Sequence, residues 1–585
     1  MTGFDPDHRA ALGRAIAAQD ADGSLAALWV AADEPGAGAA PALSARLAAE
    51  LVTVGDRELS SGRAAEALAA LRESIARRPR AAAYVNLGNV WLATGDLDAA
   101  REAYEAAVRL DPGRIEPRGN LAAVHHLAAE HDLAADAARR AVEQAGRAAA
   151  AGDPAAARMA RVLHGNFVYQ LHFHPRVTPG HLLEEHREWE RRYARPFRTD
   201  WPTQPVFPGG GELTVEGEPP SPGRRLRVGY VSPDFRDHVV GRNLVPLLAG
   251  HDHDRFEVIA YADLRTPGDA LTERLVSACD GWVDVSALDD ARLAERVRAD
   301  RVDVLVDCTL HMSQNRLPAL ARRPAPVQVT FAGYPSTTGL SAIDFRLSDP
   351  YLDPPGAASP AAEACVRLAR SFWCYDPLGV DVEVGAPPAD ANGYVTFGSL
   401  GSFAKTNDDV LALWAQVLSA VPGSRLLLLA DRGRHRGRTV EVLAARGVRD
   451  AAARVEFVAP QPRAGYLATY NRVDIALDTF PYNAHTTALD ALWMGVPVVT
   501  LCGQMPVSRA GFSHLSNLGL TEWVAHSAAD YVRIAAQLAG DAEGRRFFRR
   551  TLRGRLMGSA LADGRRFAGD VERAYLAMWA ARVGA

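Results

Sequence analysis

The stretch VDIALDTFPYNAHTTALDALWMGVPVVT, residues 473–500, holds a complete strand–turn–helix–strand pattern. The apolar run VDIALDTF predicts one buried strand, and VPVVT predicts another. Between them, ALDALWMG predicts a short helix that ends at Gly495, with Pro497 beyond it, as is usual at helix ends. Strands that alternate with helices in this way indicate an α/β domain.

Polar residues gather at the turn where the first strand meets this helix. They are His485, Thr486 and Thr487, with Asp490 one turn further along. One interpretation is structural, because a threonine hydroxyl at a helix start satisfies a first-turn N–H group. It explains neither the imidazole nor Asp490. The other interpretation is a phosphate site: a helix N-terminus offers open N–H groups and partial positive charge, and Asp490 could bind a ribose hydroxyl.

The same alternation of strands and helices extends over the last two thirds of the chain. A first set of apolar runs comprises LRVGYVS, FEVIAYA, VDVLVDC, PVQVTFAGY and FRLSD. A second set, beginning near Tyr394, comprises YVTFGSL, RLLLLA, RVEFVA, VDIALDTF and VPVVTLCG. Two successive sets predict two Rossmann-like domains that face a cleft, with ligands at the carboxyl ends of the strands.

The first third of the chain contains a repeat instead of strands. Within YVNLGNVWLATGDLDAAREAYEAAVRLDP, residues 84–112, Asn86 recurs as Asn120, and Ala100 recurs as Ala134. Both intervals are 34 residues, the period of tetratricopeptide helix pairs. A coiled coil is the alternative, but no heptad is sustained.

These patterns divide the chain into five expected parts. They are helical repeats at 1–197, a breaker-rich linker at 198–225, an N-terminal Rossmann-like half at 226–390, a C-terminal Rossmann-like half at 391–555, and a last helix at 556–585 that packs back on the rest.

Composition excludes several classes of protein. The 585 residues carry a net charge of −5 and no basic tail or stripe, so we expect no nucleic-acid partner. The N-terminus lacks a signal pattern and no apolar run is long enough to span a membrane, so we expect no membrane association. The five cysteines show neither metal spacing nor a disulfide framework, which favours a reducing cytoplasm.

Two histidines in the N-terminal half follow predicted strands. His238 comes after LRVGYVS, and His311 comes after VDVLVDC. A third candidate is the turn YPSTTG, which contains Tyr334, Pro335, Thr337 and Thr338. A capping or solvated histidine and an ordinary surface turn are the structural alternatives. Polar clusters at two strand ends nevertheless favour a cleft.

The C-terminal half offers two basic candidates. Lys405 follows a Gly/Ser loop behind a strand, where small residues let backbone approach a phosphate. Arg463 follows another strand and could supply a second charge. The alternatives are a solvated lysine and a surface arginine. The sequence Asp252-His253-Asp254 has metal-like spacing but lies before a strand, so we interpret it as a solvated turn and expect no metal site.

The chain resembles a known family in several ordered motifs. They are the repeats of about 34 residues followed by VGYVSPDFRDH, RRPAPVQVTFAGYPSTTG, TFGSLGSFAK and DTFPYNAHTTALDALWMGVPVVTL. Together they resemble the bacterial O-linked N-acetylglucosamine transferases, which are related to the plant Spindly proteins. The resemblance implies a tetratricopeptide superhelix followed by a GT-B fold of two Rossmann-like domains, the second of which binds the nucleotide sugar.

It also implies an activity and residue roles. The activity is inverting, metal-independent transfer of N-acetylglucosamine from UDP-GlcNAc to Ser or Thr hydroxyls of proteins, without a cofactor. The implied roles are base or acceptor-site group for His238, donor-phosphate contact for Lys405, diphosphate contacts for His485, Thr486 and Thr487, ribose contact for Asp490, uracil-side contact for Arg463, and sugar-site or acceptor-site lining for His311, Tyr334, Pro335, Thr337 and Thr338.

Some residues depart from the family pattern and leave alternatives open. Arg242 stands where animal relatives have a second histidine, and Gly401 and Ser402 replace longer polar side chains before the lysine. The donor could therefore be UDP-glucose or GDP-fucose. A tetratricopeptide scaffold with a degenerate transferase half is the non-enzymatic alternative. If the chain is a transferase, the repeats would dock a polypeptide acceptor. The oligomeric state stays open.

Overall fold

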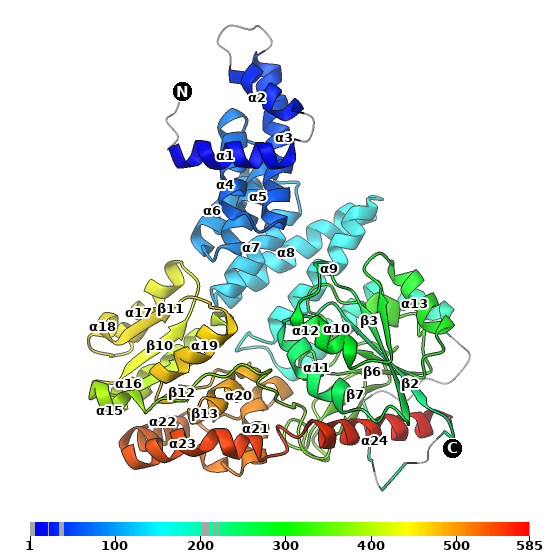
Figure 1. Ribbon diagram of the computed structural model, residues 1–585, viewed down its shortest axis with the longest axis vertical. Helices are drawn as coiled ribbons and strands as arrows, with labels where there is room; N and C mark the ends of the chain where they lie inside the picture. The colour runs from blue at the N-terminus through cyan, green and yellow to red at the C-terminus, as the bar shows by residue number, and fades with distance from the viewer. Residues whose placement is uncertain are drawn as a thin grey trace. The chain divides into compact units, whose positions relative to one another are not determined.

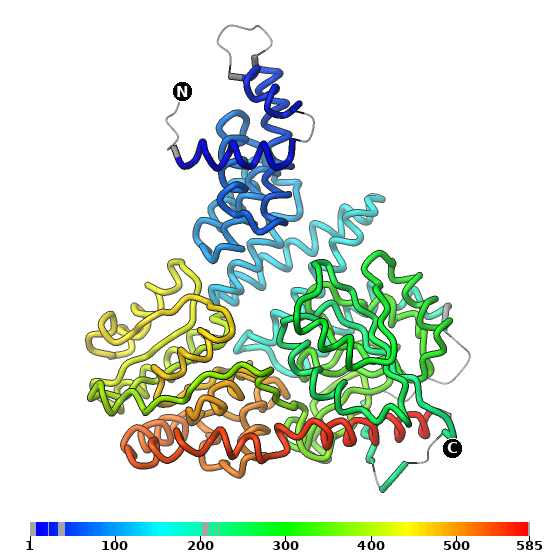
Figure 2. The backbone as a smooth tube through the Cα atoms, viewed as in Figure 1, coloured from blue at the N-terminus to red at the C-terminus, as the bar shows by residue number. Residues whose placement is uncertain are grey.

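The computed structural model describes residues 6–20, 23–33, 40–201, 210–215, 217–219 and 222–583 (Figures 1 and 2). The expected linker at 198–225 lies partly outside the described residues. The chain forms two compact units, Met1–Leu163 with Ala430–Arg438, and His164–Leu429 with Thr439–Ala585. The boundary at residue 163 lies inside the segment 1–197 that the sequence predicts to be helical repeats.

The first unit is helical. Its helices are α1 (Pro6–Gln19), α2 (Ser24–Asp33), α3 (Ala40–Ser60), α4 (Ala64–Arg77), α5 (Ala81–Ala93), α6 (Leu97–Leu110), α7 (Glu116–Leu127), α8 (His131–Ala150) and the start of α9 (Pro154–Leu171). Consecutive helices pack in pairs, α3 on α4, α5 on α6 and α7 on α8, which confirms the predicted repeat organisation. Residues Ala430–Arg438 belong to this unit, and within it Arg432 forms a β-bridge with Asp96.

Small residues let the paired helices approach closely. Gly88 of α5 lies against the ring of Tyr104 of α6, where an added Cβ would lie 2.4 Å from a ring carbon. The Tyr104 hydroxyl donates to Asn89 Oδ1 at 2.8 Å, and the amide of Asn120 donates to the same oxygen at 3.1 Å. Asn120, one of the residues that recur in the sequence, therefore connects neighbouring repeats.

The N-terminal half of the second unit contains a parallel sheet. Its strands are β1 (Glu212–Leu213), β2 (Leu226–Ser232), β3 (Phe256–Ala262), β4 (Gly281–Asp284), β5 (Val304–Asp307), β6 (Val327–Thr330), β7 (Phe345–Ser348) and β8 (Ala364–Arg367). Over the described residues their order is β1-β8-β7-β6-β5-β2-β3-β4, and every neighbouring pair is parallel. The associated helices are α11 (Val239–Gly250), α12 (Ala270–Ser277), α13 (Asp290–Ala299) and α14 (Leu317–Leu320).

The five apolar runs of this half are confirmed as β2, β3, β5, β6 and β7. The sequence did not predict β1, β4 or β8. β1 and β4 are the two edges of the sheet and stay partly exposed, so they lack the continuous apolar pattern of a buried strand. β1 lies inside the expected linker, where Glu212 pairs with Cys365 of β8.

The C-terminal half contains a second parallel sheet. Its strands are β9 (Thr396–Ser399), β10 (Arg425–Leu429), β11 (Val455–Val458), β12 (Ile475–Leu477), β13 (Val498–Leu501) and β14 (Val524–Ala525), in the order β11-β10-β9-β12-β13-β14. Its helices are α15 (Pro388–Asn392), α16 (Asp408–Ala420), α17 (Arg434–Ala445), α18 (Ala451–Arg454), α19 (Arg463–Thr469), α20 (Thr486–Trp493), α21 (Ala510–Leu518), α22 (Ala528–Gly540) and α23 (Ala542–Met557), with short 3-10 turns between them. The prediction of two Rossmann-like halves after a helical region is confirmed.

Two further helices pack on the N-terminal half. Trp189 of α10 (Pro179–Tyr193) joins the core that contains Leu305 of β5. The last helix, α24 (Gly564–Val583), packs on α11, beside which it runs in Figure 1. Its Glu572 carboxylate accepts a hydrogen bond from His251 Nδ1 at 2.8 Å. Helices that precede and follow the two Rossmann-like halves in the sequence therefore complete the N-terminal half.

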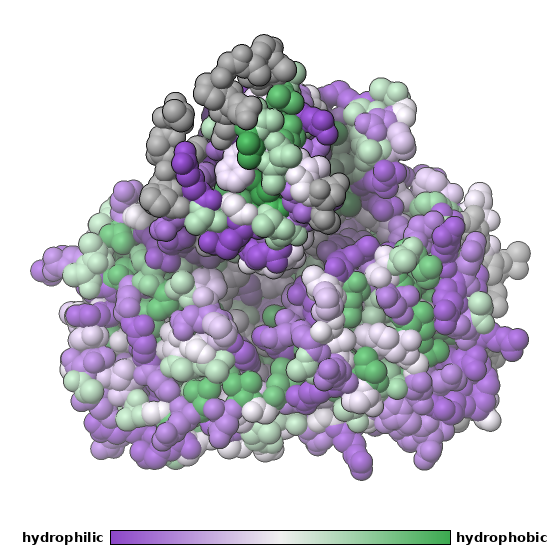
Figure 3. Space-filling view, turned by 45° about the horizontal axis from the view of Figure 1, so that its top comes forward, coloured by the Kyte–Doolittle hydropathy of each residue, from purple (hydrophilic) through white to green (hydrophobic). Residues whose placement is uncertain are grey.

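The surface carries no single dominant feature on the face that Figure 3 presents, where hydrophilic and hydrophobic side chains are interspersed. The exposed large hydrophobic residues are spread over several elements: Val30, Leu110, Leu133, Val162, Val239, Val276, Phe547 and Met557. None of the helices that the structure describes is long and apolar enough to cross a membrane.

Candidate active site

The candidate residues collect at the carboxyl ends of the two parallel sheets. In the N-terminal half, His238 follows β2, His311 follows β5 and the turn 334–339 follows β6. In the C-terminal half, Lys405 follows β9 and the His485 turn follows β12. Parallel strands place such residues at one edge of each sheet, which is where α/β folds bind ligands.

A hydrogen bond joins helices of the two halves at this edge. The side-chain amide of Asn243, on α11, donates to Thr486 Oγ1 at the start of α20, at 3.5 Å. Asn243 lies five residues beyond His238 on the same helix start. The contact therefore brings the helix that begins at His238 next to the predicted phosphate site.

The start of α20 is shaped by His485. This residue precedes the helix with φ +50°, a conformation that non-glycine residues rarely adopt. Its Nε2 lies 3.0 Å from the carbonyl oxygen of Val507, which can only accept, so Nε2 carries the proton. Burial lowers the His485 pKa well below its ordinary value, with the Lys405 charge acting in the same direction. The neutral ring thus anchors Val507, leaving Nδ1 without a proton to give to a phosphate.

The two threonines have different roles. The Thr487 hydroxyl donates to the Ala484 carbonyl at 2.7 Å, which stabilises the turn before the helix. Thr486 is buried, and its hydroxyl oxygen accepts from Asn243. The structural interpretation therefore describes Thr487, while Thr486 lies where the two halves meet.

Lys405 lies beside this helix start. Its Nζ donates to the carbonyl oxygen of Asn483 at 2.7 Å and lies 4.5 Å from the centroid of the Tyr482 ring. Burial lowers the pKa of Lys405 to about 8, against the opposing charge of Asp478. Asp478 also accepts from the Ala484 N–H at 2.6 Å, so one carboxylate fixes the turn and faces the lysine charge. Positive charge thus converges on the N-terminus of α20.

Arg463 and Asp490 lie together as an ion pair. The Arg463 guanidinium donates to both Asp490 oxygens, with Nη1 at 2.8 Å from Oδ2, and the Tyr375 hydroxyl donates to Oδ1 at 3.0 Å. Asp490 is almost completely buried. Burial lowers the pKa of Arg463, but the hydrogen bonds and charge of Asp490, together with the nearby tyrosines, outweigh burial, so the pKa of Arg463 is raised overall. The two residues implied to contact the ribose and the uracil are therefore held to each other.

His238 lies at the start of α11, with about a third of its side chain exposed. Its Nδ1 is 3.3 Å from the Val240 N–H and 3.4 Å from an Asp234 carboxylate oxygen. The first contact needs a lone pair on Nδ1, whereas the second needs a proton there. Burial lowers the His238 pKa, and Asp234 opposes that shift. The hydrogen bond that the structure records is the one that Nδ1 accepts from Val240, and Nε2 is the accepting nitrogen only in the tautomer whose Nδ1 proton faces Asp234. Arg242 is bound elsewhere, to Asp237 at 2.7 Å.

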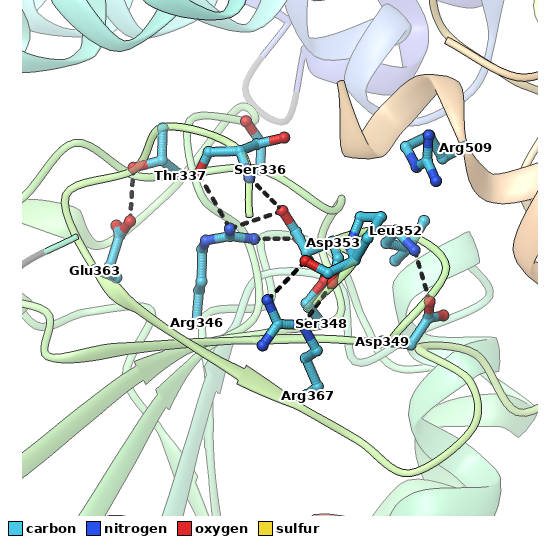
Figure 4. A network of polar contacts seen from close by, with 12 residues as sticks. Ser336, Thr337, Arg346, Ser348, Asp349, Leu352, Asp353, Glu363, Arg367 and Arg509 are labelled. Carbon is cyan, nitrogen blue, oxygen red and sulfur yellow. Dashed lines mark hydrogen bonds and ion pairs between the residues drawn. The ribbon is translucent and has the colours of Figure 1, made fainter. Parts of the chain in front are cut away.

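His311 and the turn 334–339 form a buried framework. His311 is fully buried, its Nε2 donates to the Thr338 carbonyl at 2.7 Å, and burial lowers its pKa to about 3. The Thr337 hydroxyl donates to Glu363 at 2.6 Å, as Figure 4 shows, and the Thr338 hydroxyl and N–H donate to the same carboxylate. Tyr334 is also buried. These side chains fix the turn from within.

The exposed side of the same turn borders a small cavity. Pro335 and Ser336 line it together with residues 505–507 of the C-terminal half. Arg346 lines the cavity as well, and in Figure 4 its guanidinium points toward Asp353, to which Nη1 donates at 2.6 Å. Of the turn residues proposed for substrate contact, Pro335 and Thr337 line this cavity, whereas Thr338 does not.

Sequence reasoning missed several residues that contact the candidate site. They are Tyr169, His172, Phe173, Asn243, Glu363, Tyr375 and Tyr482. Tyr482 lies inside the opening motif and could have been noticed there. Asn243 lies only five residues beyond His238 and could also have been noticed. The others approach from segments farther away in the chain, and no local pattern marks them.

The structure offers no evident metal cage in the part of the chain that it describes, where no group of three or more His, Cys, Asp or Glu side chains is placed to hold an ion. Within the suspected metal-like turn, His253 Nδ1 lies 2.8 Å from Asp280. That turn therefore makes a hydrogen bond to Asp280 at the surface.

Family models match most of the chain. The model of glycosyl transferase family 41 matches residues 214–378 and 386–571, and a tetratricopeptide repeat model matches residues 54–115. Together they cover both predicted regions in the predicted order.

Two similar curated proteins come from plants. The chain is 38% identical over 415 residues to a probable UDP-N-acetylglucosamine–peptide N-acetylglucosaminyltransferase SPINDLY of Solanum lycopersicum, covering 69% of this chain and 42% of that protein. It is 27% identical over 368 residues to the corresponding SEC protein of Arabidopsis thaliana, covering 61% of this chain and 37% of that protein. The chain thus spans less than half the length of these relatives.

A solved structure resembles the chain more completely. A mutant of the Thermobaculum terrenum O-GlcNAc transferase superposes with a TM-score of 0.80 at 35% identity, covering 92% of this chain and 99% of that one. This likeness supports the predicted GT-B arrangement of the two Rossmann-like halves.

Proposed function

The chain belongs to glycosyl transferase family 41, and from this premise we propose that it transfers N-acetylglucosamine from UDP-N-acetylglucosamine to Ser and Thr hydroxyls of proteins. The observation that carries the proposal is the convergence of Lys405, the N-terminus of α20 and the start of α11 at one edge. The first two suit a leaving diphosphate, and the third carries His238 at its N-cap.

The proposed reaction is a single displacement at the anomeric carbon. The acceptor oxygen forms a bond to that carbon while the bond to the UDP phosphate breaks, so the configuration inverts. The hydroxyl proton goes to His238 Nε2, and the electron pair of the broken bond stays on UDP. Neutral His238 is suited to this role because burial lowers its pKa.

The negative charge that develops on UDP would be stabilised by groups that are already in place. The α20 backbone N–H groups and partial helix charge face it, with the Lys405 ammonium beside them. His485 contributes by holding the residue 505–507 segment against this helix start. We therefore propose that transfer requires no metal ion.

Calorimetry of the full chain with UDP, GDP, UDP-N-acetylglucosamine, UDP-glucose and GDP-fucose in the presence of EDTA tests this proposal. A companion assay follows transfer to a Ser-containing protein by mass spectrometry. Binding of UDP-N-acetylglucosamine and addition of one N-acetylhexosamine would support it. Tighter binding of UDP-glucose or GDP-fucose would identify that nucleotide sugar as the donor in place of UDP-N-acetylglucosamine. A folded protein that binds no nucleotide would leave the scaffold alternative.

We also propose that the helical repeats dock a polypeptide acceptor. Paired helices of this kind form extended binding surfaces, and docking raises the local concentration of the acceptor hydroxyl. A long acceptor should then have a lower KM than a short peptide with the same Ser site, at a similar kcat. Equal KM values for the two would contradict docking.

A further inference from the structure

The end of α9 contacts loops of both catalytic halves. Residues 116–213 lie between the two family models, so neither assigns a role to this segment. Tyr169, His172 and Phe173 stand at or just beyond the helix end, in the same compact unit as both Rossmann-like halves. Their contacts lead directly to residues of the candidate site.

His172 holds the turn of the N-terminal half. Its Nδ1 lies 3.2 Å from the Val168 carbonyl and 3.1 Å from the Tyr169 carbonyl, so that nitrogen carries the proton. Its Nε2 is then an acceptor, and it receives the Ser336 hydroxyl at 2.7 Å. The His172 ring also lies edge-on to Tyr334, with centroids 4.9 Å apart. The helix end thereby fixes the turn that borders the site.

Phe173 holds the turn of the C-terminal half. Its ring stacks on Tyr482, with centroids 4.4 Å apart and an interplanar angle of 17°. Tyr482 in turn stacks on His485 at 4.6 Å, and Lys405 Nζ lies 4.5 Å from the Tyr482 ring centroid. His485 and Lys405 of the proposed diphosphate site therefore contact the Tyr482 ring, and Phe173, just beyond the end of α9, stacks on that ring.

We propose that Phe173 is a positioning residue for the transfer reaction: by fixing the Tyr482 ring, it fixes Lys405 and His485 where the diphosphate leaves. This inference rests on the proposed transferase function. It predicts a kinetic effect, because small displacements of groups that stabilise a transition state lower kcat strongly. Ordinary core packing predicts only a loss of stability.

The test compares two variants of the full chain, Phe173→Leu and Phe167→Leu. Phe167 is a matched control: it is also buried on α9, and its ring contacts His164, with the centroids 6.4 Å apart. We expect Phe173→Leu to lower kcat by about tenfold to a hundredfold while UDP affinity changes little. We expect Phe167→Leu to keep kcat at temperatures where both variants are folded.

A pH profile supplies a second readout. Burial keeps the Lys405 pKa at about 8. Replacing the Phe173 ring admits water around Tyr482 and Lys405, so that the alkaline limb of kcat/KM should move to higher pH. The control should leave this limb in place. A purely structural role of Phe173 would not move it.

The Tyr482→Phe and Tyr482→Leu pair keeps the test valid if Phe173→Leu does not fold. Phe retains the stacked ring and should retain most of kcat, whereas Leu should lose it. Two results would overturn this inference and leave the proposed function standing. One is that Phe173→Leu has the same kinetics as Phe167→Leu. The other is that the two Tyr482 variants have the same kcat. Failure of the unmodified chain to bind UDP and transfer sugar would overturn the proposed function, and this inference with it.

Discussion

The guanidinium of Arg463 and the carboxylate of Asp490 bind each other through two hydrogen bonds, although 27 residues separate them in the sequence. The Tyr375 hydroxyl adds a third bond to the same carboxylate. A nucleotide that enters this side of the site therefore meets a preformed pair and not two free charges.

Removal of one member of this pair should destabilise the protein strongly. Asp490→Ala leaves a buried guanidinium without its carboxylate, and we expect the free energy of unfolding to fall by about 3–5 kcal/mol. Urea denaturation of Asp490→Ala, Arg463→Met and the double variant Arg463→Met/Asp490→Ala measures this. The double variant should lose less than the sum of the single losses. Additive losses would show that the pair contributes nothing as a pair.

Deprotonation of Lys405 should cause the alkaline limb of the pH profile of kcat/KM. Its ammonium form exists below a pKa of about 8 and is lost above it, so kcat/KM of the free enzyme should fall as the pH rises through about 8. Lys405→Ala should lower kcat by about 10²–10³-fold and weaken UDP binding much less. Steady-state kinetics from pH 6 to 10 and calorimetry with UDP provide the measurements. An unchanged kcat would remove Lys405 from the reaction.

Protonation of His238 should cause the acid limb of the pH profile of activity. Its neutral form accepts the proton, so activity should fall as the pH drops below the lowered pKa of this residue. Because Asp234 raises the His238 pKa, Asp234→Asn should move the acid limb to still lower pH. His238→Gln should abolish the limb along with most of kcat. An acid limb that persists in an active His238→Gln variant would assign it to another group.

His485 should matter through the bond that it donates to Val507. His485→Ala removes that bond and loosens the helix start, so UDP binding should weaken. His485→Gln offers a side-chain N–H group in its place and should recover part of the affinity. Calorimetry with UDP distinguishes these outcomes. Full affinity in His485→Ala would show that the helix start needs no such support.

Thr337 and Thr338 should affect stability and not substrate affinity. Both hydroxyls donate to the buried Glu363. Replacing either by Val removes a hydrogen bond to a charged group and should lower the free energy of unfolding by about 1.5–3 kcal/mol. KM for the donor, measured where the variants are folded, should stay unchanged. A raised KM with unchanged stability would return these residues to the sugar site.

Much of the fold followed from local patterns. The buried strands are continuous apolar runs, and the residues after β2, β9 and β12 were expected together because parallel strands end at one edge. The repeat period likewise predicted the paired helices. The two edge strands β1 and β4 were not predicted, because partly exposed strands lack the continuous apolar pattern of a buried strand.

The partners of the site residues could not be read from the sequence. His311 follows a strand just as His238 does, but Trp189 of α10 lies 4.9 Å from its ring and helps to bury it. That helix lies more than a hundred residues earlier in the sequence, and no pattern near His311 predicts the contact. Likewise, the bond between His172 and Ser336 spans 164 residues. Long-range packing, and not local chemistry, decides which strand-end residues face the substrate.

The course of α9 determines how the chain can be shortened. This helix starts at Pro154 in one compact unit and ends at Leu171 in the other. Removing residues 1–197, the segment that the sequence predicts to be helical repeats, would remove Phe173 and its neighbours together with the repeats. Loss of activity in such a fragment would say nothing about acceptor docking. A fragment that begins at Pro154 keeps the helix whole, and only that one separates the contribution of the repeats from damage to the site.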